Sequence, residues 1–277
     1  MVQRKSVRGS ARVRVTERTS AASISREDRV VVEEPLEIRL AAPARAATRA
    51  TVTMRTPGHD FELAAGWMFH EGVVARADDI ATVAYCTDAD LSEEERFNVV
   101  TLTARAIVRD PSPRALSNSA CGVCGTSSIS EVFAHLPTTR SPGGPVSGDL
   151  LASLPNLMRE HQPVFDRTGG LHAAALFSAA GDLLVIREDV GRHNAVDKVT
   201  GSQLLSGVEP NGGLMCTSGR LGFEIVQKSI ASGRLAIVGV GAPTSLSVSL
   251  AQEAGVVLIG FAREDRYVIY SRPDLVT

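Results

Sequence analysis

The sequence lacks three features that would assign it to a class at once. No apolar run approaches the roughly 18 residues of a membrane-spanning helix, so we expect no membrane span. Neither charge is in surplus: the net charge of the 277 residues is −2, which argues against nucleic acid as a partner. The basic N-terminus has no apolar stretch typical of a secretory signal, so we expect a cytoplasmic protein.

Cysteine is scarce, with four residues in the chain, and in a reducing compartment these thiols stay reduced. A zinc site needs about four N or S ligands, yet no second Cys-x-x-Cys is present. None of the six histidines is followed two residues later by glutamate, which argues against a zinc nucleoside deaminase. Cys86 and Cys216 lie in predicted strands and are expected to be small buried residues.

The other two cysteines, Cys121 and Cys124, form a Cys-x-x-Cys pair within the Ser- and Gly-rich segment 119–128. A helix is predicted to follow, and its N-terminal amides would lower the pKa of a thiol below its usual ~8.5. The thiolate is both a nucleophile and a metal ligand. The pair alone is therefore compatible with thiol redox chemistry or sulfur transfer, with half a zinc site, or with chance.

Breakers and periodicity divide the chain into three parts. Six Arg or Lys against one Glu in the first 20 residues predict a disordered basic tail over 1–24, with an arm that docks on an acidic partner as the alternative. Short strands around one helix predict an α+β domain over 25–116, which ends near the breaker segment 110–113. Over 117–277, strands alternate with helices, which predicts an α/β domain with a partly parallel sheet covered on both faces.

A dense polar run, residues 187–198, lies at a predicted strand end and leads into a helix. His193 and Asp197 are four residues apart, so on a helix they share a face. Asp197 could then orient the imidazole of His193 as an acid or base. The alternative is a solvated first turn with ordinary ion pairs.

Three later turns have the residues that an anionic ligand needs. Ser218 and Gly219 follow one apolar strand and Thr244 follows another, each before a helix, where free amides suit phosphate. In the third turn, 260–266, Phe261 could stack on a base while Arg263 or Arg266 meets phosphate. The alternatives are efficient turns and caps, and a charged hairpin turn.

These motifs together resemble a known family. From residue 28 to the C-terminus, the chain is similar to FdhD, the formate dehydrogenase accessory sulfurtransferases. The resemblance rests on five segments: Ser-Ala-Cys-Gly-Val-Cys-Gly at 119–125, Arg-Glu-Asp-Val-Gly-Arg-His-Asn-Ala-Val-Asp-Lys at 187–198, Thr-Ser-Gly-Arg at 217–220, Gly-Ala-Pro-Thr-Ser-Leu at 241–246 and Gly-Phe-Ala-Arg at 260–263.

The resemblance implies a sulfur carrier between a cysteine desulfurase and the molybdenum cofactor of formate dehydrogenase. Cys121 would hold the persulfide and Cys124 would accept or resolve it. The cofactor implied is bis-molybdopterin guanine dinucleotide, with no tightly bound metal of the protein's own. Its site would be formed by Gly260, Phe261, Ala262, Arg263, Glu264, Asp265 and Arg266.

The family also implies a homodimer and a cytidine-deaminase-like three-layer domain with a mixed sheet, preceded by a smaller α+β domain. Two other functions remain open. One is a cofactor-binding chaperone without sulfur transfer, and the other is a thiol–disulfide oxidoreductase.

Overall fold

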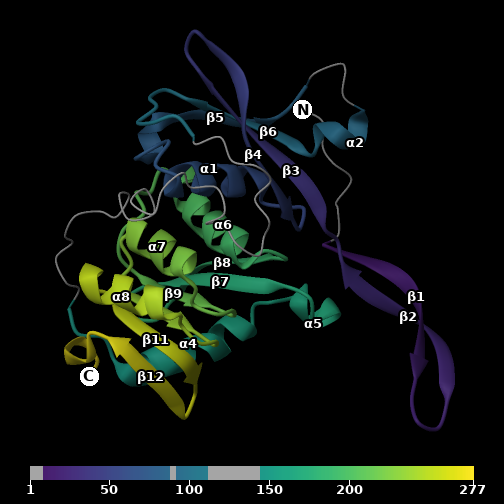
Figure 1. The fold of residues 1–277 in the computed structure, drawn as a ribbon, viewed down its shortest axis with the longest axis vertical. Helices are drawn as coiled ribbons and strands as arrows, with labels where there is room; N and C mark the ends of the chain where they lie inside the picture. The colour runs from purple at the N-terminus through teal and green to yellow at the C-terminus, as the bar shows by residue number, and fades with distance from the viewer. Residues whose placement is uncertain (1–8, 88–91, 112–143) are drawn as a thin grey trace.

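The computed structural model describes residues 9–87, 92–111 and 144–277 (Figure 1). The strands are β1 Ser10–Arg18, β2 Ser23–Val31, β3 Glu34–Ala42, β4 Arg45–Arg55, β5 Ile80–Tyr85, β6 Val99–Ala104, β7 His172–Phe177, β8 Leu183–Asp189, β9 Leu214–Thr217, β10 Ala236–Gly239, β11 Val257–Arg263 and β12 Arg266–Ser271. The helices are α1 Asp60–His70, α2 Glu93–Arg96, α4 Gly148–Arg159, α5 Phe165–Thr168, α6 Arg192–Leu205, α7 Phe223–Ala231 and α8 Ser245–Ala254, with short 3-10 turns at Ala77–Asp79 and Pro273–Leu275.

A six-stranded mixed sheet forms the centre of the C-terminal part, in the order β12-β11-β10-β9-β7-β8. Its middle strands β9, β10 and β11 run parallel, and the other pairings are antiparallel. Side chains alternate across it: on β9, Met215 packs with the helices α6, α7 and α8, whereas Leu214 and Cys216 pack with α4 on the opposite face. The predicted α/β class and mixed sheet are confirmed, and the likeness to cytidine deaminase stays a prediction.

A second, four-stranded sheet in the order β4-β3-β6-β5 lies toward the N-terminus. Leu36, Ile38 and Leu40 alternate along β3 and are fully buried. They pack against Leu63 and Met68 of α1, which covers this sheet. In the described ranges, no helix is both long enough and apolar enough to cross a membrane.

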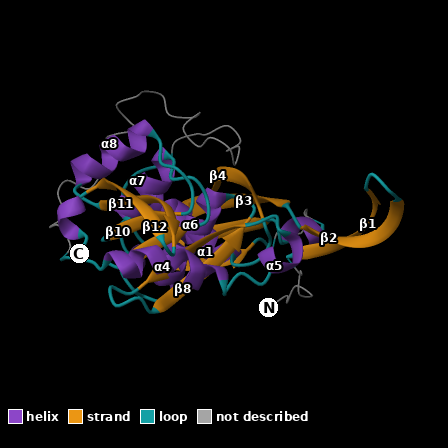
Figure 2. Ribbon diagram, turned by 90° about the horizontal axis from the view of Figure 1, so that it is seen from below, coloured by secondary structure: helices purple, strands orange, loops and turns teal. Residues whose placement is uncertain are grey.

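Strands β1 and β2 form an antiparallel hairpin that projects from the body (Figures 1 and 2). The expectation of a disordered tail over 1–24 is therefore wrong for residues 10–24. The charges suggested disorder, but Val13 and Val15 alternate with polar residues at the period of a strand. Across the hairpin, Arg26 pairs with Glu17 at 2.5 Å, so part of the charge is compensated between the two strands.

Helices α1 and α6 join the two sheets by packing backbone against backbone. A Cβ atom on Gly66 would lie 1.9 Å from the carbonyl oxygen of Asp197, and one on Gly201 would lie 1.8 Å from that of Glu62. Neither glycine has a positive φ, so close approach rather than backbone conformation requires glycine at both positions. Each helix thus supplies one glycine to the crossing.

We expect Gly66→Ala and Gly201→Ala each to lower the free energy of unfolding by about 3 kcal/mol or more, because two backbones must move apart. Alanine is the better helix former by about 1 kcal/mol, so helix propensity alone would change stability in the opposite direction. Urea unfolding monitored by circular dichroism measures the effect. The control is Gly144→Ala, since a Cβ there would meet no atom of the described residues within 4 Å. Equal stability of all three variants would contradict the close crossing.

Candidate functional site

The three turns that follow β9, β10 and β11 lie side by side at one edge of the six-stranded sheet. The backbone N–H of Gly241 donates to the carbonyl of Gly219 at 3.2 Å, and that of Phe261 donates to the carbonyl of Gly241 at 3.2 Å. The Nη1 of Arg263 donates to the carbonyl of Val240 at 3.2 Å. Because β9, β10 and β11 are parallel, this edge contains their carboxyl ends, where ligands of open α/β sheets bind.

The first two turns are held by structural hydrogen bonds. The Oγ of Ser218 accepts from the backbone N–H of Ala173 at 2.9 Å, which ties the turn to β7. At Gly219, a Cβ would lie 3.4 Å from Nδ1 of His172. The side-chain oxygen of Thr244 caps α8 by accepting a backbone N–H of its first turn at 3.3 Å. The side chain of Thr244 thus acts as a helix cap, the alternative interpretation of this turn.

Phe261 has an unusual conformation. It adopts φ 53° in the irregular pairing between Gly260 and Arg263, and its side chain is exposed, with a residue exposure of 40%. A bulky residue in the left-handed region costs about 1–3 kcal/mol and persists at functional sites. An exposed aromatic ring held in this way favours stacking on a ligand over core packing.

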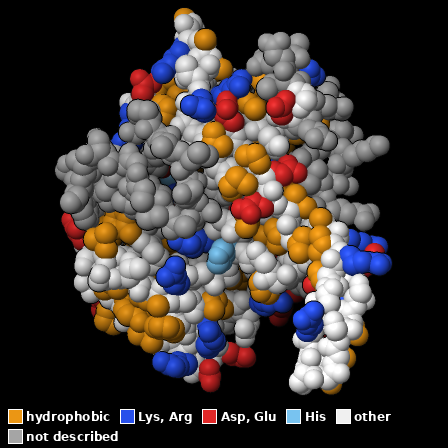
Figure 3. Space-filling model, turned by 45° about the vertical axis from the view of Figure 1, so that its right-hand side comes forward, with side chains coloured by type: hydrophobic (Ala, Val, Ile, Leu, Met, Phe, Trp, Pro, Cys, Tyr) orange, Lys and Arg blue, Asp and Glu red, His pale blue; other side chains and the backbone are white. Residues whose placement is uncertain are grey.

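The rest of this turn is divided between fold and surface. Ala262 is fully buried, and Glu264 accepts a hydrogen bond from Nδ2 of Asn156 on α4 at 3.2 Å. Asp265 and Arg266 are exposed in the hairpin turn between β11 and β12. The predicted charged hairpin turn is thus also present. In the space-filling view, several Lys and Arg side chains lie near an exposed histidine (Figure 3).

His193, in the first turn of α6, has a different carboxylate partner from the one expected. Its Nε2 lies 3.0 Å from Oε2 of Glu224, which is in the first turn of α7. Burial, together with the nearby charges of Lys228 and Arg192, lowers the pKa of His193 to about 3. The imidazole is therefore neutral at pH 7, and the predicted orientation by Asp197 is wrong.

Asp197 instead lies in a buried cluster between three helices. Its carboxylate is 2.5 Å from Nδ1 of His70 and accepts from Nζ of Lys228 at 2.6 Å, and the other ring nitrogen of His70 lies 2.8 Å from Oγ of Ser232. Burial raises the pKa of Asp197, but Lys228 and His70 outweigh it, so the pKa is lowered overall. Burial lowers the pKa of His70. This cluster stabilises the contact of α1, α6 and α7.

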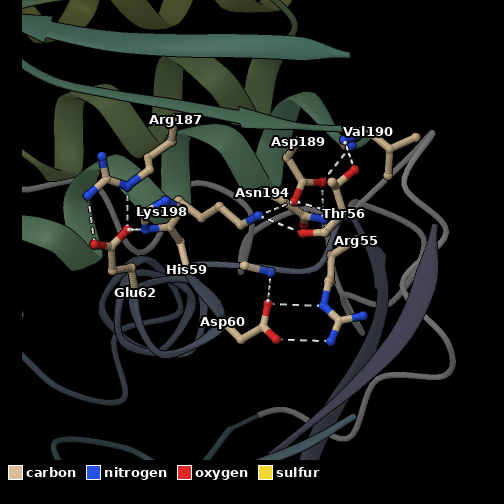
Figure 4. Close-up of polar contacts among 12 residues, drawn as sticks. Arg55, Thr56, His59, Asp60, Glu62, Arg187, Asp189, Val190, Asn194 and Lys198 are labelled. Carbon is tan, nitrogen blue, oxygen red and sulfur yellow. Dashed lines mark hydrogen bonds and ion pairs between the residues drawn. The ribbon is translucent and has the colours of Figure 1, made fainter. Parts of the chain in front are cut away.

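The polar run 187–198 proves to be part of the contact between the two sheets rather than a solvated turn. Figure 4 shows Lys198 reaching Asp189, with Nζ 2.6 Å from Oδ2, and the carbonyl of Thr56 at 2.9 Å. In the same view, Arg187 makes two hydrogen bonds to the carboxylate of Glu62. Asp189 and Lys198 are both almost fully buried, so each charge compensates the other.

Sequence reasoning missed the partners of this run in segment 55–60. Arg55 and Asp60 form a fully buried bidentate ion pair, and the backbone N–H of Thr56 donates to Asp189. The signal was present in the dense polar sequence Arg-Thr-Pro-Gly-His-Asp just before α1. Nothing in that sequence, however, indicates that its partners lie about 130 residues away.

Comparison with known proteins assigns the chain to a family. A family model described as the FdhD/NarQ family matches residues 31–277. The chain belongs to the FdhD/NarQ family. It is 43% identical over 274 residues to the sulfur carrier protein FdhD of Mycolicibacterium paratuberculosis, which covers 96% of this chain and 98% of that one. It is 43% identical over 276 residues to the sulfur carrier protein FdhD of Streptomyces coelicolor, at 95% and 96% coverage.

A solved structure shares the fold of this FdhD/NarQ chain. It is the crystal structure of a protein from Desulfotalea psychrophila described as a formate dehydrogenase accessory protein. The TM-score is 0.77 at 23% sequence identity, and the match covers 98% of this chain and all of that one. At this identity the likeness concerns the arrangement of the backbone.

The cysteines of this family member fall into two groups. Cys121 and Cys124 lie outside the described residues. Cys216 is fully buried on β9, and burial raises the pKa of its thiol far above the usual range. Cys86 is half-buried, and Nη1 of Arg39 lies 3.7 Å from its Sγ. Within the described ranges, no group of three or more His, Cys, Asp or Glu side chains could hold a metal ion.

The low pKa of His193 predicts a pH dependence of stability. An unfolded histidine takes up a proton near pH 6.5, whereas folded His193 stays neutral down to about pH 3. Between these values the unfolded state binds more protons, so the contribution of His193 is complete above pH 6.5 and is lost as the pH falls. From pH 7 to pH 5, we expect wild type to lose about 2 kcal/mol more stability than His193→Gln.

Urea unfolding at both pH values measures this difference. The matched control is His161→Gln, whose side chain is exposed and which should keep the pH dependence of wild type. If His193→Gln and wild type lose the same stability over this range, His193 is not a neutral buried group.

Proposed function

We propose that this chain is a sulfur carrier that accepts persulfide sulfur from a cysteine desulfurase on Cys121. It transfers that sulfur to the molybdenum cofactor, bis-molybdopterin guanine dinucleotide, before the cofactor enters formate dehydrogenase. The observation that carries the proposal is the near full-length similarity to relatives named sulfur carrier protein FdhD. The Cys-x-x-Cys pair supplies the chemistry that those names require.

Sulfur transfer needs two balanced steps. First, the thiolate of Cys121 attacks the outer sulfur of the donor persulfide; the new S–S bond forms on Cys121, and the donor leaves as a thiolate. Second, the thiolate of Cys124 attacks Sγ of Cys121. A Cys121–Cys124 disulfide forms, and the outer sulfur leaves as hydrosulfide toward the cofactor. The two thiols supply the two electrons, and a cellular thiol reductant must restore them.

The three adjacent turns are the proposed site for the guanine dinucleotide substrate. Phe261 offers an exposed ring for the guanine, and Arg263 and Arg266 lie beside it for the phosphates. Ser218 and Gly219 place backbone amides at the end of β9. The side chain of Thr244 is occupied in capping α8. Thr244 would therefore contribute to ligand binding through the backbone at the start of that helix.

The proposal also names the setting. The proposed sulfur donor is a cysteine desulfurase, and the proposed client is formate dehydrogenase. Both transfer steps require reduced thiols, so the cytoplasm is the proposed location. A homodimer is the proposed assembly, as in the family that the motifs resemble. No resident metal or nicotinamide takes part in the two steps.

We expect Cys121→Ala to abolish persulfide loading when the protein is incubated with a desulfurase and cysteine. Mass spectrometry of the intact protein and of its peptides measures the added sulfur. Cys86→Ala is the matched control and should load like wild type, because it keeps the Cys-x-x-Cys pair. Full loading of Cys121→Ala would refute the carrier role of this residue.

The two alternatives give different results. A chaperone without sulfur transfer predicts that the double variant Cys121→Ala/Cys124→Ala still rescues formate dehydrogenase activity. A thiol–disulfide oxidoreductase predicts that wild type reduces insulin. We expect neither result.

For the cofactor site, we expect Phe261→Ala to weaken GDP binding by about tenfold or more, because base–aromatic stacking contributes roughly 1–3 kcal/mol. Isothermal titration calorimetry measures the affinity. Leu246→Ala removes another exposed apolar side chain, in the first turn of α8, and should bind GDP like wild type. Equal affinities of both variants would exclude stacking on Phe261.

A further inference from the structure

A cavity of about 430 Å³ lies beside the three turns, on the face of the sheet covered by α4. It extends from the C-terminal half of α4 and from α5 to the start of β7 and to the ends of β9 and β10. Its volume falls within the usual range for small-molecule sites, about 300–1,000 Å³. Of the motif residues assigned to the cofactor, Ser218 alone lines this cavity, and the two transfer steps do not use it.

One side chain in this cavity is buried without a partner. Gln162 is only 2% exposed and lines the cavity. Its backbone carbonyl accepts from Asp166. Its side-chain amide has no hydrogen-bond partner among the described residues and is not among the fully buried unpaired atoms, so it keeps accessible surface toward the cavity that it lines. An amide with so little access to water and no protein partner is less favourable at this position than an apolar side chain of the same size. The cost is explained if the amide binds a ligand that enters the cavity.

The other lining residues indicate the chemistry of that ligand. Met158, Phe165 and Leu171 provide apolar walls, which suit the faces of a flat ring. His172 and Ser218 add hydrogen-bonding groups on the β-sheet side. Burial lowers the pKa of His172, which favours the neutral ring with one donor and one acceptor nitrogen. A primary amide such as that of Gln162 matches a ring edge that carries adjacent donor and acceptor atoms.

The cavity also has a cationic group. Arg159 lies over the ring of Phe165, with Cζ 4.7 Å from the centroid, and pairs with Asp166 at 2.5 Å. Its side chain is 48% exposed, so the guanidinium lies where the cavity meets solvent. A ligand with its ring inside and an anionic substituent outside would place that substituent near Arg159.

We propose that this cavity binds a planar nitrogen heterocycle with an amide edge and an anionic substituent, and that Gln162 recognises the edge. The inference rests on the proposed function, whose substrate contains two kinds of such heterocycle, pterin and guanine. Because Phe261 is the proposed stacking residue for guanine, the pterin is the ring left for the cavity. Both rings share the same hydrogen-bonding edge, so experiment must separate them.

The test measures binding of two probes, pterin-6-carboxylate by its own fluorescence and GMP by calorimetry, to wild type and to Gln162→Leu. We expect wild type to bind pterin-6-carboxylate and Gln162→Leu to bind it about tenfold more weakly or worse, because one edge contact is lost. The melting temperature of Gln162→Leu should equal or exceed that of wild type, since an unsatisfied amide is removed. Gln252→Leu, on the exposed face of α8, is the control and should bind like wild type.

The outcomes distinguish pterin from guanine as the bound ring, and the cavity proposal from the sulfur-carrier proposal. A loss confined to pterin-6-carboxylate supports the pterin, and a loss confined to GMP supports the guanine as the ring in this cavity. Unchanged affinity for both probes, or a lower melting temperature with unchanged affinity, overturns the proposal.

Persulfide loading of wild-type Cys121 is measured in parallel. If loading succeeds while neither probe binds, the cavity assignment fails and the sulfur carrier stands; if loading fails, the carrier role fails independently.

Discussion

The direct backbone contact between α1 and α6 is the constraint on which the rest of the structure depends. Two glycines, Gly66 and Gly201, bring each helix onto a carbonyl of the other and leave no room for a side chain. Once the backbones are this close, the charged side chains around them are excluded from water. Each buried charge must be paired with an opposite charge, since breaking a buried ion pair lowers stability by about 3–5 kcal/mol. The pairs that cross between the two parts, Arg187 with Glu62 and Asp197 with His70, therefore fix the relative position of the two sheets.

The same contact determines the environment of the candidate site. Helix α6 starts at the carboxyl-end edge of the six-stranded sheet, so its position sets where His193 meets Glu224. Lys228 is bound to Asp197 below them, and its charge helps to keep the imidazole of His193 neutral. A change at the helix crossing would thus alter the electrostatics of the edge without touching a ligand. In this way the packing of the core and the chemistry of the site are coupled through one helix.

Much of the fold could be predicted from the sequence, because it depends on local periodicity. The apolar strands, the helices that follow them and the mixed sheet all come from patterns within about ten residues. The errors arose where the decisive partner is distant. The spacing of His193 and Asp197 was real, but Asp197 pairs with His70, 127 residues away, and His193 with Glu224 on the next helix. For the hairpin, the density of charge predicted disorder. The alternation of Val13 and Val15 with polar residues is the pattern that the strand follows.

Sulfur chemistry and a buried core make opposite demands on cysteine. Cys216 shows one demand: in the centre of the sheet, burial raises the pKa of its thiol so far that the thiolate is not formed. A persulfide carrier needs the thiolate, together with access for a donor and then for an acceptor. The strands that create the carboxyl-end edge therefore cannot supply the sulfur themselves. This division explains why the proposed nucleophile lies in a separate segment of small and hydroxyl residues, while the turns at the ends of the strands form the proposed binding surface.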